Sequence, residues 1–458
     1  MRIERAKLRG GRQFARRVGA LAFVACLLFF GATAANAQEA PADPMLAPPP
    51  AAPRTVATWD EAIALLRAHS PDYRSNQDTI LRAEAQTRIA LAGVLPTLYG
   101  QATYTHQFLT STIPFGGASI VTPPPNVAGL GATATWTPLN PRAMYGLGTA
   151  ERNVDAAKLA FEERRRQLAV AMVDVMLETL AAERVAELNR TGLRASLERL
   201  LLTQTRQQYG QGTALDVDRA QQDVAASRAL IVTGDETLRQ ARESLGVVLG
   251  LRVPVAPPRE LDIERLERSV ASACRLNEEI EKRPDVVAAR TRAEIARRAI
   301  RDAELMTAPT IGVTSQLAYA SEVTFGPLTT WSVAGVLTVP FYDGGVRYGA
   351  LRDARAAADQ ADQALEAARL SAIVASARAH RAVGVTDASR DVARQQRDLA
   401  QRIDERTRDG YAHGLGTSLD LVISAQALRQ AEISLAVLEF QVAEARANAV
   451  LANAECVY

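Results

Sequence analysis

Two long stretches without proline set the strongest limit on how this chain can fold. Residues 142–209 and 346–411 are rich in Ala, Leu, Arg, Glu and Gln and contain no proline. At 1.5 Å per residue, a helix of roughly 65 residues is about 100 Å long. No single globular domain holds such a helix, so each one must lie against neighbouring helices as in a coiled coil.

The two stretches belong to two copies of one unit. Four sequence markers recur in the same order at offsets of 202 to 213 residues, which indicates a tandem duplication. We predict a first repeat over 57–252, a connector over 253–282 and a second repeat over 283–454. Each repeat is predicted to contain a helix, a β-hairpin, a very long helix, a glycine turn and a returning helix, in that order. The markers are Ser70-Pro71-Asp72 with Arg283-Pro284-Asp285, Pro96-Thr97-Leu98 with Pro309-Thr310-Ile311, Trp136-Thr137-Pro138-Leu139 with Thr338-Val339-Pro340-Phe341, and Gly210–Asp216 with Gly414–Asp420.

The predicted hairpins stand out because they lack charge. Residues 96–141 contain no Asp, Glu, Lys or Arg, and residues 309–341 contain only Glu322, in a chain that is 23% charged. Within both windows apolar residues alternate with Thr, Ser, Gly and Gln, the period of a β-strand. Each window is long enough for two strands of about 9–11 residues, the length that crosses a bilayer at a tilt.

Two environments suit such hairpins. A hairpin packed on the helices of a soluble protein would carry Lys or Glu on its outer face, whereas these windows lack charge on both faces, which favours lipid. Four strands cannot close a barrel, and open edges in lipid cost several kcal/mol for each unpaired backbone group. We therefore predict an α+β membrane protein. Three protomers would supply twelve strands to a barrel continuous with a long periplasmic α-helical barrel.

The N-terminus predicts export. Residues 2–17 carry seven bases and one acid, an apolar run follows from Ala20 to Phe30, and Ala35-Asn36-Ala37 forms a cleavage site. We expect a signal peptide over 1–37 and a mature chain that begins at Gln38. Cys26 lies inside the apolar run rather than at its end, which argues against lipidation. Residues 38–56 are rich in Pro and Ala and are predicted to form an extended tether.

Charge and composition exclude several functions. Without the signal the chain keeps 46 bases and 50 acids, a net charge of −4, so it lacks the basic surface that nucleic acid requires. Cys274 and Cys456 could form a disulfide in an oxidising compartment, but their spacing does not decide it. The four histidines are scattered and no nucleophile motif or zinc motif occurs. We expect no catalytic residue, no metal and no cofactor.

The repeated glycine turns lie at the ends of the long helices. Gly210 and Gly414 suit helix termination, and Thr213 and Thr417 can cap the returning helices, which is a sufficient structural reason for the pattern. A functional interpretation also follows from position. The turns lie about 100 Å from the hairpins. Three protomers would then gather six carboxylates, from Asp216 and Asp420, around a periplasmic entrance.

In its motifs the chain resembles the TolC-like outer-membrane efflux family, from about Ala57 to Ala454. The family implies a trimer that serves as the exit duct of tripartite efflux pumps and type I secretion systems, without catalytic residues. The implied partners are a periplasmic adaptor (membrane fusion) protein, an inner-membrane transporter and outer-membrane lipid. The resemblance rests on Trp59-Asp60-Glu61-Ala62, Leu95-Pro96-Thr97-Leu98, Arg283-Pro284-Asp285, Pro340-Phe341-Tyr342-Asp343-Gly344-Gly345, and Tyr411 with Gly414 and Leu419-Asp420.

The resemblance also implies site residues. Asp216 and Asp420 match the family's entrance aspartates. Some members have a basic residue where Gly416 stands and a second acid near Ile423 or Ser424, so the entrance lock implied here is simpler. A structural or adhesin-like periplasmic coiled coil without a pore is the alternative function. The implied adaptor-contact tips are Tyr209, Gly210, Gln211, Gly212 and Thr213, with Tyr411, Gly414, Leu415, Gly416 and Thr417.

Overall fold

The computed structural model describes residues 43–258, 268–269, 272, 274–276, 279–323, 326–452 and 454–456. The chain divides into two compact units, Met1–Pro44 and Met45–Tyr458. Within the described residues, every α-helix and β-strand belongs to the second unit. The predicted signal peptide and its cleavage site before Gln38 lie outside the described residues, as does part of the predicted connector.

Three helices of ordinary length precede the main strands, two in the first repeat and one in the second. They are α1 (Trp59–His69), α2 (Pro71–Ala92) and α6 (Pro284–Glu304). Both α2 and α6 begin at a proline, whose missing amide costs nothing in the first turn of a helix. Ser70 caps α2, since its hydroxyl accepts from the Tyr73 amide at 3.5 Å. Short 3-10 turns lie at Pro44–Leu46 (η1), Ile280–Lys282 (η2) and Leu305–Thr307 (η3).

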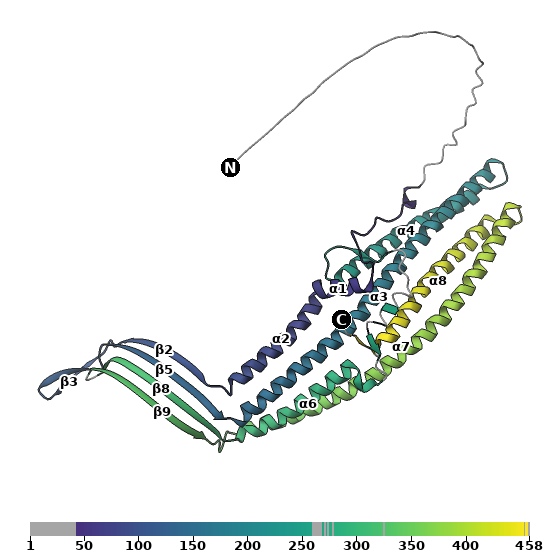
Figure 1. The fold of residues 1–458 in the computed structure, drawn as a ribbon. Coiled ribbons are helices and arrows are strands. Elements are labelled where there is room, and N and C mark those ends of the chain that lie inside the picture. The colour runs from purple at the N-terminus through teal and green to yellow at the C-terminus, as the bar shows by residue number, and fades with distance from the viewer. Residues whose placement is uncertain are drawn as a thin grey trace, which may run out of the picture. The chain divides into compact units, whose positions relative to one another are not determined.

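Two very long helices run through the second unit. Helix α3 (Pro141–Gln208) has 68 residues and α7 (Val346–Ala412) has 67, so each is about 100 Å long. Each turns back into a helix of 35 residues, α4 (Ala214–Val248) or α8 (Ser418–Ala452). Figure 1 shows two antiparallel helical hairpins, α3 with α4 and α7 with α8, whose tips lie at the end opposite the strands.

One antiparallel sheet contains strands from both repeats. Its strands are β2 (Thr97–His106), β5 (Asn126–Leu139), β8 (Thr310–Val323) and β9 (Gly326–Thr338), in the order β2-β5-β8-β9. The pairing of β5 with β8 joins the two repeats, and Leu130 stands opposite both Ala102 and Tyr319. Strands β2 and β9 form the two edges of the sheet.

The register sorts side chains onto two different faces. Successive residues of a strand alternate between faces, and opposed residues share one. One face therefore gathers the polar residues Gln101, Thr133, Gln316 and Ser332. On the apolar face, the Trp331 indole donates to the Ser315 hydroxyl at 3.0 Å, which satisfies both polar groups. The apolar face contains Leu98, Ala102, Leu130, Ala132, Trp136, Val313, Leu317, Tyr319, Trp331, Val333 and Leu337.

The first strand window contains more than the two strands that its sequence suggested. Between β2 and β5 the chain forms a second hairpin, β3 (Ser111–Phe115) with β4 (Ala118–Thr122). Gly116 and Gly117 have φ values of +55° and +89°, as a tight two-residue turn requires. The expectation of one hairpin over 96–141 is corrected accordingly. The extra hairpin forms its own two-stranded sheet, so the main sheet keeps four strands.

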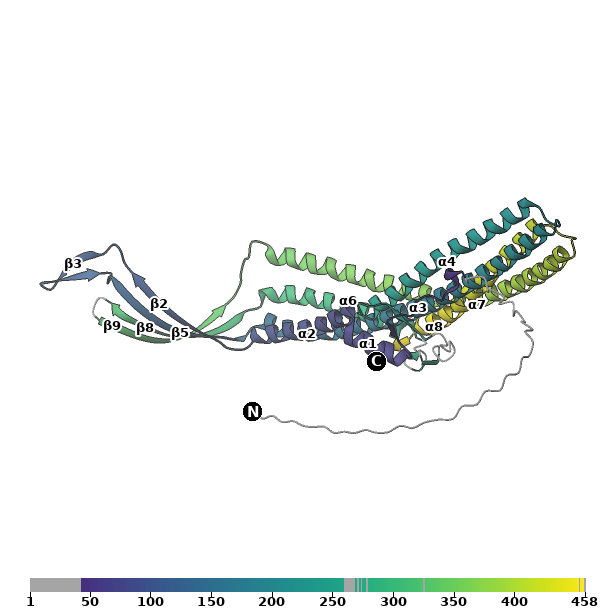
Figure 2. The same ribbon diagram turned by 90° about the horizontal axis from the view of Figure 1, so that it is seen from above.

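The main apolar core lies midway along the helices, where α1, α3, α4 and α8 meet. Trp59, Met172, Leu249 and Leu451 are at most 3% exposed there. Two short sheets close this region: β1 (Arg54–Thr55) pairs with β6 (Val255–Ala256), and β7 (Cys274–Leu276) pairs with β10 (Ala454–Cys456). Figure 2 shows α1 alongside the longer helices between the sheet and the tips.

The segment that precedes α1 is bound to the helices along part of its length. The Arg190 guanidinium donates to the Ala47 carbonyl at 2.7 Å, and Arg242 donates to the Pro50 carbonyl at 2.7 Å. Met45 and Leu46 pack against a buried cluster of α3 and α4. Proline-rich backbone leaves carbonyls free for such donors. Residues 45–50 of the predicted tether therefore follow the surface of the helical hairpin.

Helix α8 is long and apolar enough to cross a membrane by length and composition alone, and it is one such helix among the described residues. It lies against α7 along its length and also contacts α3. Leu421, Leu435 and Leu451 are buried in these contacts. About 33% of its apolar window is buried in this way, so packing within the protomer explains part of the apolar character of α8.

Candidate functional site at the helical tips

The turn between α3 and α4 is built from a glycine and a capping box. Gly210 has a φ of +73°, a conformation that glycine adopts without a Cβ clash. The Thr213 hydroxyl accepts from the Asp216 amide at 3.2 Å, and the Thr213 amide donates to Asp216 Oδ2 at 3.0 Å. This reciprocal pair satisfies two amides that the start of α4 leaves unpaired.

The turn between α7 and α8 repeats this arrangement. Gly414 has a φ of +78°. The Thr417 hydroxyl accepts from the Asp420 amide at 3.2 Å, and Asp420 Oδ2 accepts from the Thr417 amide at 3.2 Å. The shared Gly-x-Gly-Thr-x-Leu-Asp sequence therefore has a shared structural cause. Both aspartates act as helix caps.

The two tips are joined to each other by polar contacts. Asp216 Oδ1 accepts a hydrogen bond from the Ser418 hydroxyl at the start of α8. The Arg206 guanidinium donates to the Tyr411 carbonyl and lies 4.5 Å from the centroid of the Tyr411 ring. Arg219 donates to Ser418 Oγ at 3.5 Å. These contacts hold the α3–α4 hairpin against the α7–α8 hairpin at the end farthest from the sheet (Figures 1 and 2).

The two aspartates differ in their surroundings although both caps are alike. The Ser418 hydrogen bond is the main cause that lowers the pKa of Asp216, and the Thr213 amide adds to it. The hydrogen bond from the Thr417 hydroxyl is the main cause that lowers the pKa of Asp420. No residue of the α3–α4 hairpin contributes to that lowering. Both groups are therefore anions at neutral pH. Asp216 contacts the other hairpin through Ser418, whereas the hydrogen bonds of Asp420 stay within its own turn.

The structure places most of the sequence-predicted tip residues at the surface. Tyr209 is 77% exposed and Leu415 is 87% exposed. Tyr411 differs, since it is 4% exposed and packs against Arg206. Leu215 and Leu419, which are not among the predicted adaptor-contact residues, are also exposed. The remaining predicted tip residues are exposed or half-buried: Gly210, Gln211, Gly212, Thr213, Gly414, Gly416 and Thr417.

A buried polar network lies closer to the core than the tips and was missed by sequence reasoning. Arg199 on α3 pairs with Asp223 on α4 at 2.6 Å, with side chains 8% and 1% exposed. Gln426 on α8 donates to the second Asp223 oxygen at 3.2 Å. Arg429 on α8 donates to Ser227 at 2.7 Å. The network ties the first helical hairpin to α8.

One glycine inside α3 is explained by this network. A Cβ at Gly192 would lie 2.7 Å from Cδ of Arg429. The absence of a side chain at Gly192 therefore makes room for Arg429 between the helices. Glycine costs about 0.5–1 kcal/mol in a helix interior, so its presence opposite an inserted arginine was the available sequence signal.

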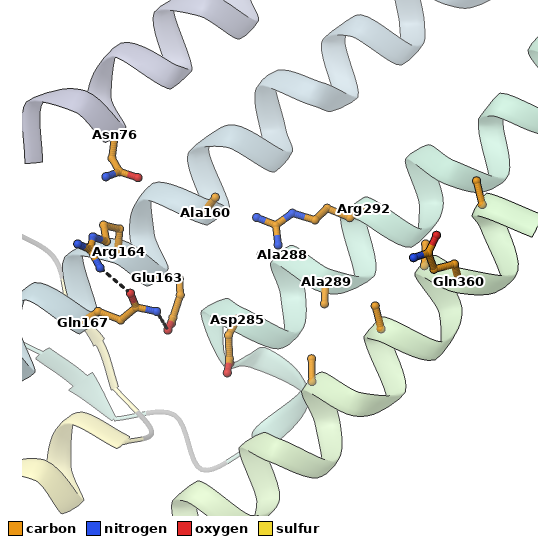
Figure 3. Close-up of a pocket in the computed structure, with 14 residues that line it drawn as sticks. Asn76, Ala160, Glu163, Arg164, Gln167, Asp285, Ala288, Ala289, Arg292 and Gln360 are labelled. Atoms are coloured by element: carbon orange, nitrogen blue, oxygen red, sulfur yellow. Dashed lines mark hydrogen bonds between the residues drawn. The ribbon is translucent and has the colours of Figure 1, made fainter. Parts of the chain in front are cut away.

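An open groove of about 740 Å³ lies among α2, α3, α6 and α7 (Figure 3). Alanines line much of it, including Ala160, Ala288 and Ala289. Three of its polar residues are joined by hydrogen bonds, since Gln167 donates to Glu163 at 2.8 Å and accepts from Arg164 at 3.1 Å. Within the described part of the chain, no group of three or more His, Cys, Asp or Glu could hold a metal ion.

An apolar-faced sheet at one end of helices about 100 Å long defines a protomer of a membrane channel. The family model described as outer membrane efflux protein matches residues 62–251 and 276–454. The chain belongs to this family of outer-membrane channel proteins, which are not enzymes. The TolC-like resemblance inferred from the sequence is confirmed. The protein is therefore located in the outer membrane, with its helical part in the periplasm.

A curated relative agrees with this assignment. The pyoverdine export outer membrane protein OpmQ of Pseudomonas putida is 26% identical over 399 residues, which cover 81% of this chain and 80% of OpmQ.

Solved structures show the same fold. A membrane protein from Pseudomonas aeruginosa has a TM-score of 0.73 at 22% identity, covering 89% of this chain and 98% of that protein. CusC has a TM-score of 0.74 at 17% identity, covering 90% of this chain and 97% of CusC.

Proposed function

We propose that three copies of this chain assemble into a passive exit duct across the outer membrane. The observation that carries the proposal is the four-stranded sheet with one apolar face, one polar face and two open edges, β2 and β9. Three such sheets supply twelve strands, an even number within the range of bacterial barrels. In that barrel the apolar face contacts lipid and the polar face lines water.

The helices extend the same duct into the periplasm. The long helices α3 and α7, each about 100 Å long, form with the shorter helices of three protomers a curved wall around a water-filled lumen. Cargo enters at the tips and leaves through the barrel. The chain supplies no energy source, so the duct conducts what an inner-membrane transporter delivers, in a tripartite efflux pump or a type I secretion system. Pyoverdine export, named for OpmQ, supports an export duct here without defining its cargo.

The tips are the proposed contact for a periplasmic adaptor protein. Tyr209 and Leu415 project at the end farthest from the membrane with 77% and 87% of their surface exposed. Large exposed apolar side chains at one end of a periplasmic protein favour a protein partner there. Asp216 and Asp420 are proposed to charge the entrance between these tips, six carboxylates in the trimer.

Single-channel recording tests the duct. Mature protein purified from outer membranes and added to a planar lipid bilayer should give discrete conductance steps, and light scattering in detergent should give the mass of three protomers. The matched control is Leu130→Arg, which places a charge on the lipid face and should prevent insertion. A well-folded wild-type protein with no conductance would support the pore-less periplasmic coiled coil instead.

A further inference from the structure

The two cysteines of the mature region stand opposite each other in the backbone. Strand β7 pairs antiparallel with β10, and the register sets Cys274 directly across from Cys456. Directly opposed residues of an antiparallel pair have Cα atoms about 4.5 or 5.5 Å apart. Both separations fall within the roughly 4.4–6.8 Å over which a disulfide joins two residues.

The position of the pair determines its redox environment. Strand β10 follows α8 and lies against α3 and α8, within the helical part of the protein. That part is periplasmic, and the periplasm is a compartment in which disulfides form and persist. The third cysteine of the chain, Cys26, falls in the predicted signal peptide. The mature chain would thus contain two cysteines, and the fold brings their backbones together from positions about 180 residues apart.

We propose that Cys274 and Cys456 form an intramolecular disulfide. The oxidant is a periplasmic dithiol–disulfide oxidoreductase in its disulfide form. The thiolate of one cysteine attacks that disulfide and forms a mixed disulfide, and the second thiolate then displaces the oxidoreductase. The two cysteine thiols lose two protons and two electrons in total, and the oxidoreductase disulfide is reduced to a dithiol.

The bond would fix the end of the second repeat to the connector between the repeats. Both paired strands are only three residues long, so their ladder alone offers few hydrogen bonds. A covalent link across about 180 residues restricts the unfolded chain and keeps β10 paired with β7. The inference requires export to the periplasm but neither trimer formation nor conductance. A protein with the bond and no conductance would therefore count against the proposed duct alone.

Peptide mapping tests the bond directly. Mature protein from outer membranes is denatured in the presence of an alkylating agent, without reductant, and digested with trypsin. The expected product joins the peptide of residues 269–275 to that of residues 447–458, and reduction should separate the two. Both peptides recovered separately in alkylated form without reduction would overturn the proposal. So would a link between two copies of either peptide, because it would join different chains.

Matched variants separate the bond from a general effect of mutation. Cys274→Ser and Cys456→Ser should each free one thiol, which a maleimide of high mass then labels without reductant, whereas wild-type labels at neither. The double variant and the reduced wild-type should melt at the same temperature, a few degrees below oxidised wild-type. Wild-type that labels at two thiols without reductant would contradict the proposal even if every variant failed to fold.

Discussion

The guanidinium of Arg206 lies 4.5 Å from the centre of the Tyr411 ring, which joins the end of α3 to the end of α7. Arg206 also donates to the Tyr411 carbonyl, and the Tyr411 side chain is 4% exposed. The hydrogen bond from Ser418 to Asp216 is a second link at the same level. The separation of the two helical tips is thus set by a few polar contacts.

Removing the Arg206 contact should loosen the tips. Cation–π contacts contribute roughly 0.5–2 kcal/mol. Arg206→Ala should therefore raise single-channel conductance while leaving the sheet intact. Tyr411→Phe keeps both the ring and the carbonyl and should conduct like wild-type. Equal conductance of Arg206→Ala and wild-type would show that this contact does not restrict the entrance.

The entrance charge can be separated from the link between hairpins. Like-charged carboxylates around a narrow opening attract cations, so Asp420→Ala should weaken block by multivalent cations from the periplasmic side. Asp216→Ala should weaken block and also raise conductance, because it removes both a charge and the Ser418 contact. Ser418→Ala removes the contact and keeps the charge, so it should raise conductance with cation block unchanged. Cation block unchanged in Asp216→Ala/Asp420→Ala would reduce both residues to helix caps.

The link at Asp216 should depend on pH only in acid. Its folded pKa is lowered from 3.8, chiefly by the Ser418 hydrogen bond, so the stabilisation is present above pH 3.8 and is lost as pH falls through the folded pKa. Conductance should therefore be insensitive to this group between pH 7 and about pH 4 and rise below that. The rise should be smaller in Asp216→Asn than in wild-type. A rise centred near neutral pH would contradict this assignment.

The two faces of the sheet should respond differently to charge. Leu130 lies on the apolar face and is 61% exposed, whereas Thr133 lies on the polar face. Leu130→Arg should impair assembly by about 2–4 kcal/mol, the cost of a base near the bilayer midplane. Thr133→Arg should insert normally. Trimer yield from outer membranes measures both, and equal tolerance would mean that the lipid face is misassigned.

Asp223 should be essential for stability although it lies away from the tips. Its carboxylate is buried against Arg199, so Asp223→Ala leaves an uncompensated guanidinium inside the protein. Breaking a buried pair in this way costs about 3–5 kcal/mol. Asp218→Ala, at an exposed position of the same helix, should cost far less. Thermal unfolding of the two variants in detergent provides the comparison.

The regular elements were predictable because their signals are local. Helix α3 covers Pro141–Gln208, where the proline-free stretch predicted helix over 142–209. The caps at Thr213 and Thr417 follow from their own turn sequences. Alternation likewise indicated strands and their two faces. The small hairpin of β3 and β4 was missed although Gly116-Gly117, a pair typical of a two-residue turn, lies between its strands.

The contacts between the two repeats could not be predicted from local sequence patterns. The pairing of β5 with β8 depends on how the two repeats lie together, which neither window encodes alone. The Arg206–Tyr411 contact joins residues 205 positions apart. Arg199 and Asp223 lie in helices where many charged residues face water, so composition could not single out the buried pair. Arg and Asp are seldom fully buried, and which of them are buried depends on the partner that the tertiary structure provides.

The unpaired edges of β2 and β9 have a genetic consequence. If a barrel closes only when every protomer has two intact edge strands, one defective protomer prevents closure of the whole barrel. In a cell that makes wild-type and edge-defective chains in equal amounts, about one trimer in eight would contain wild-type chains alone. Substitutions at these edges should therefore be dominant, whereas substitutions that stop a chain from folding at all should be recessive.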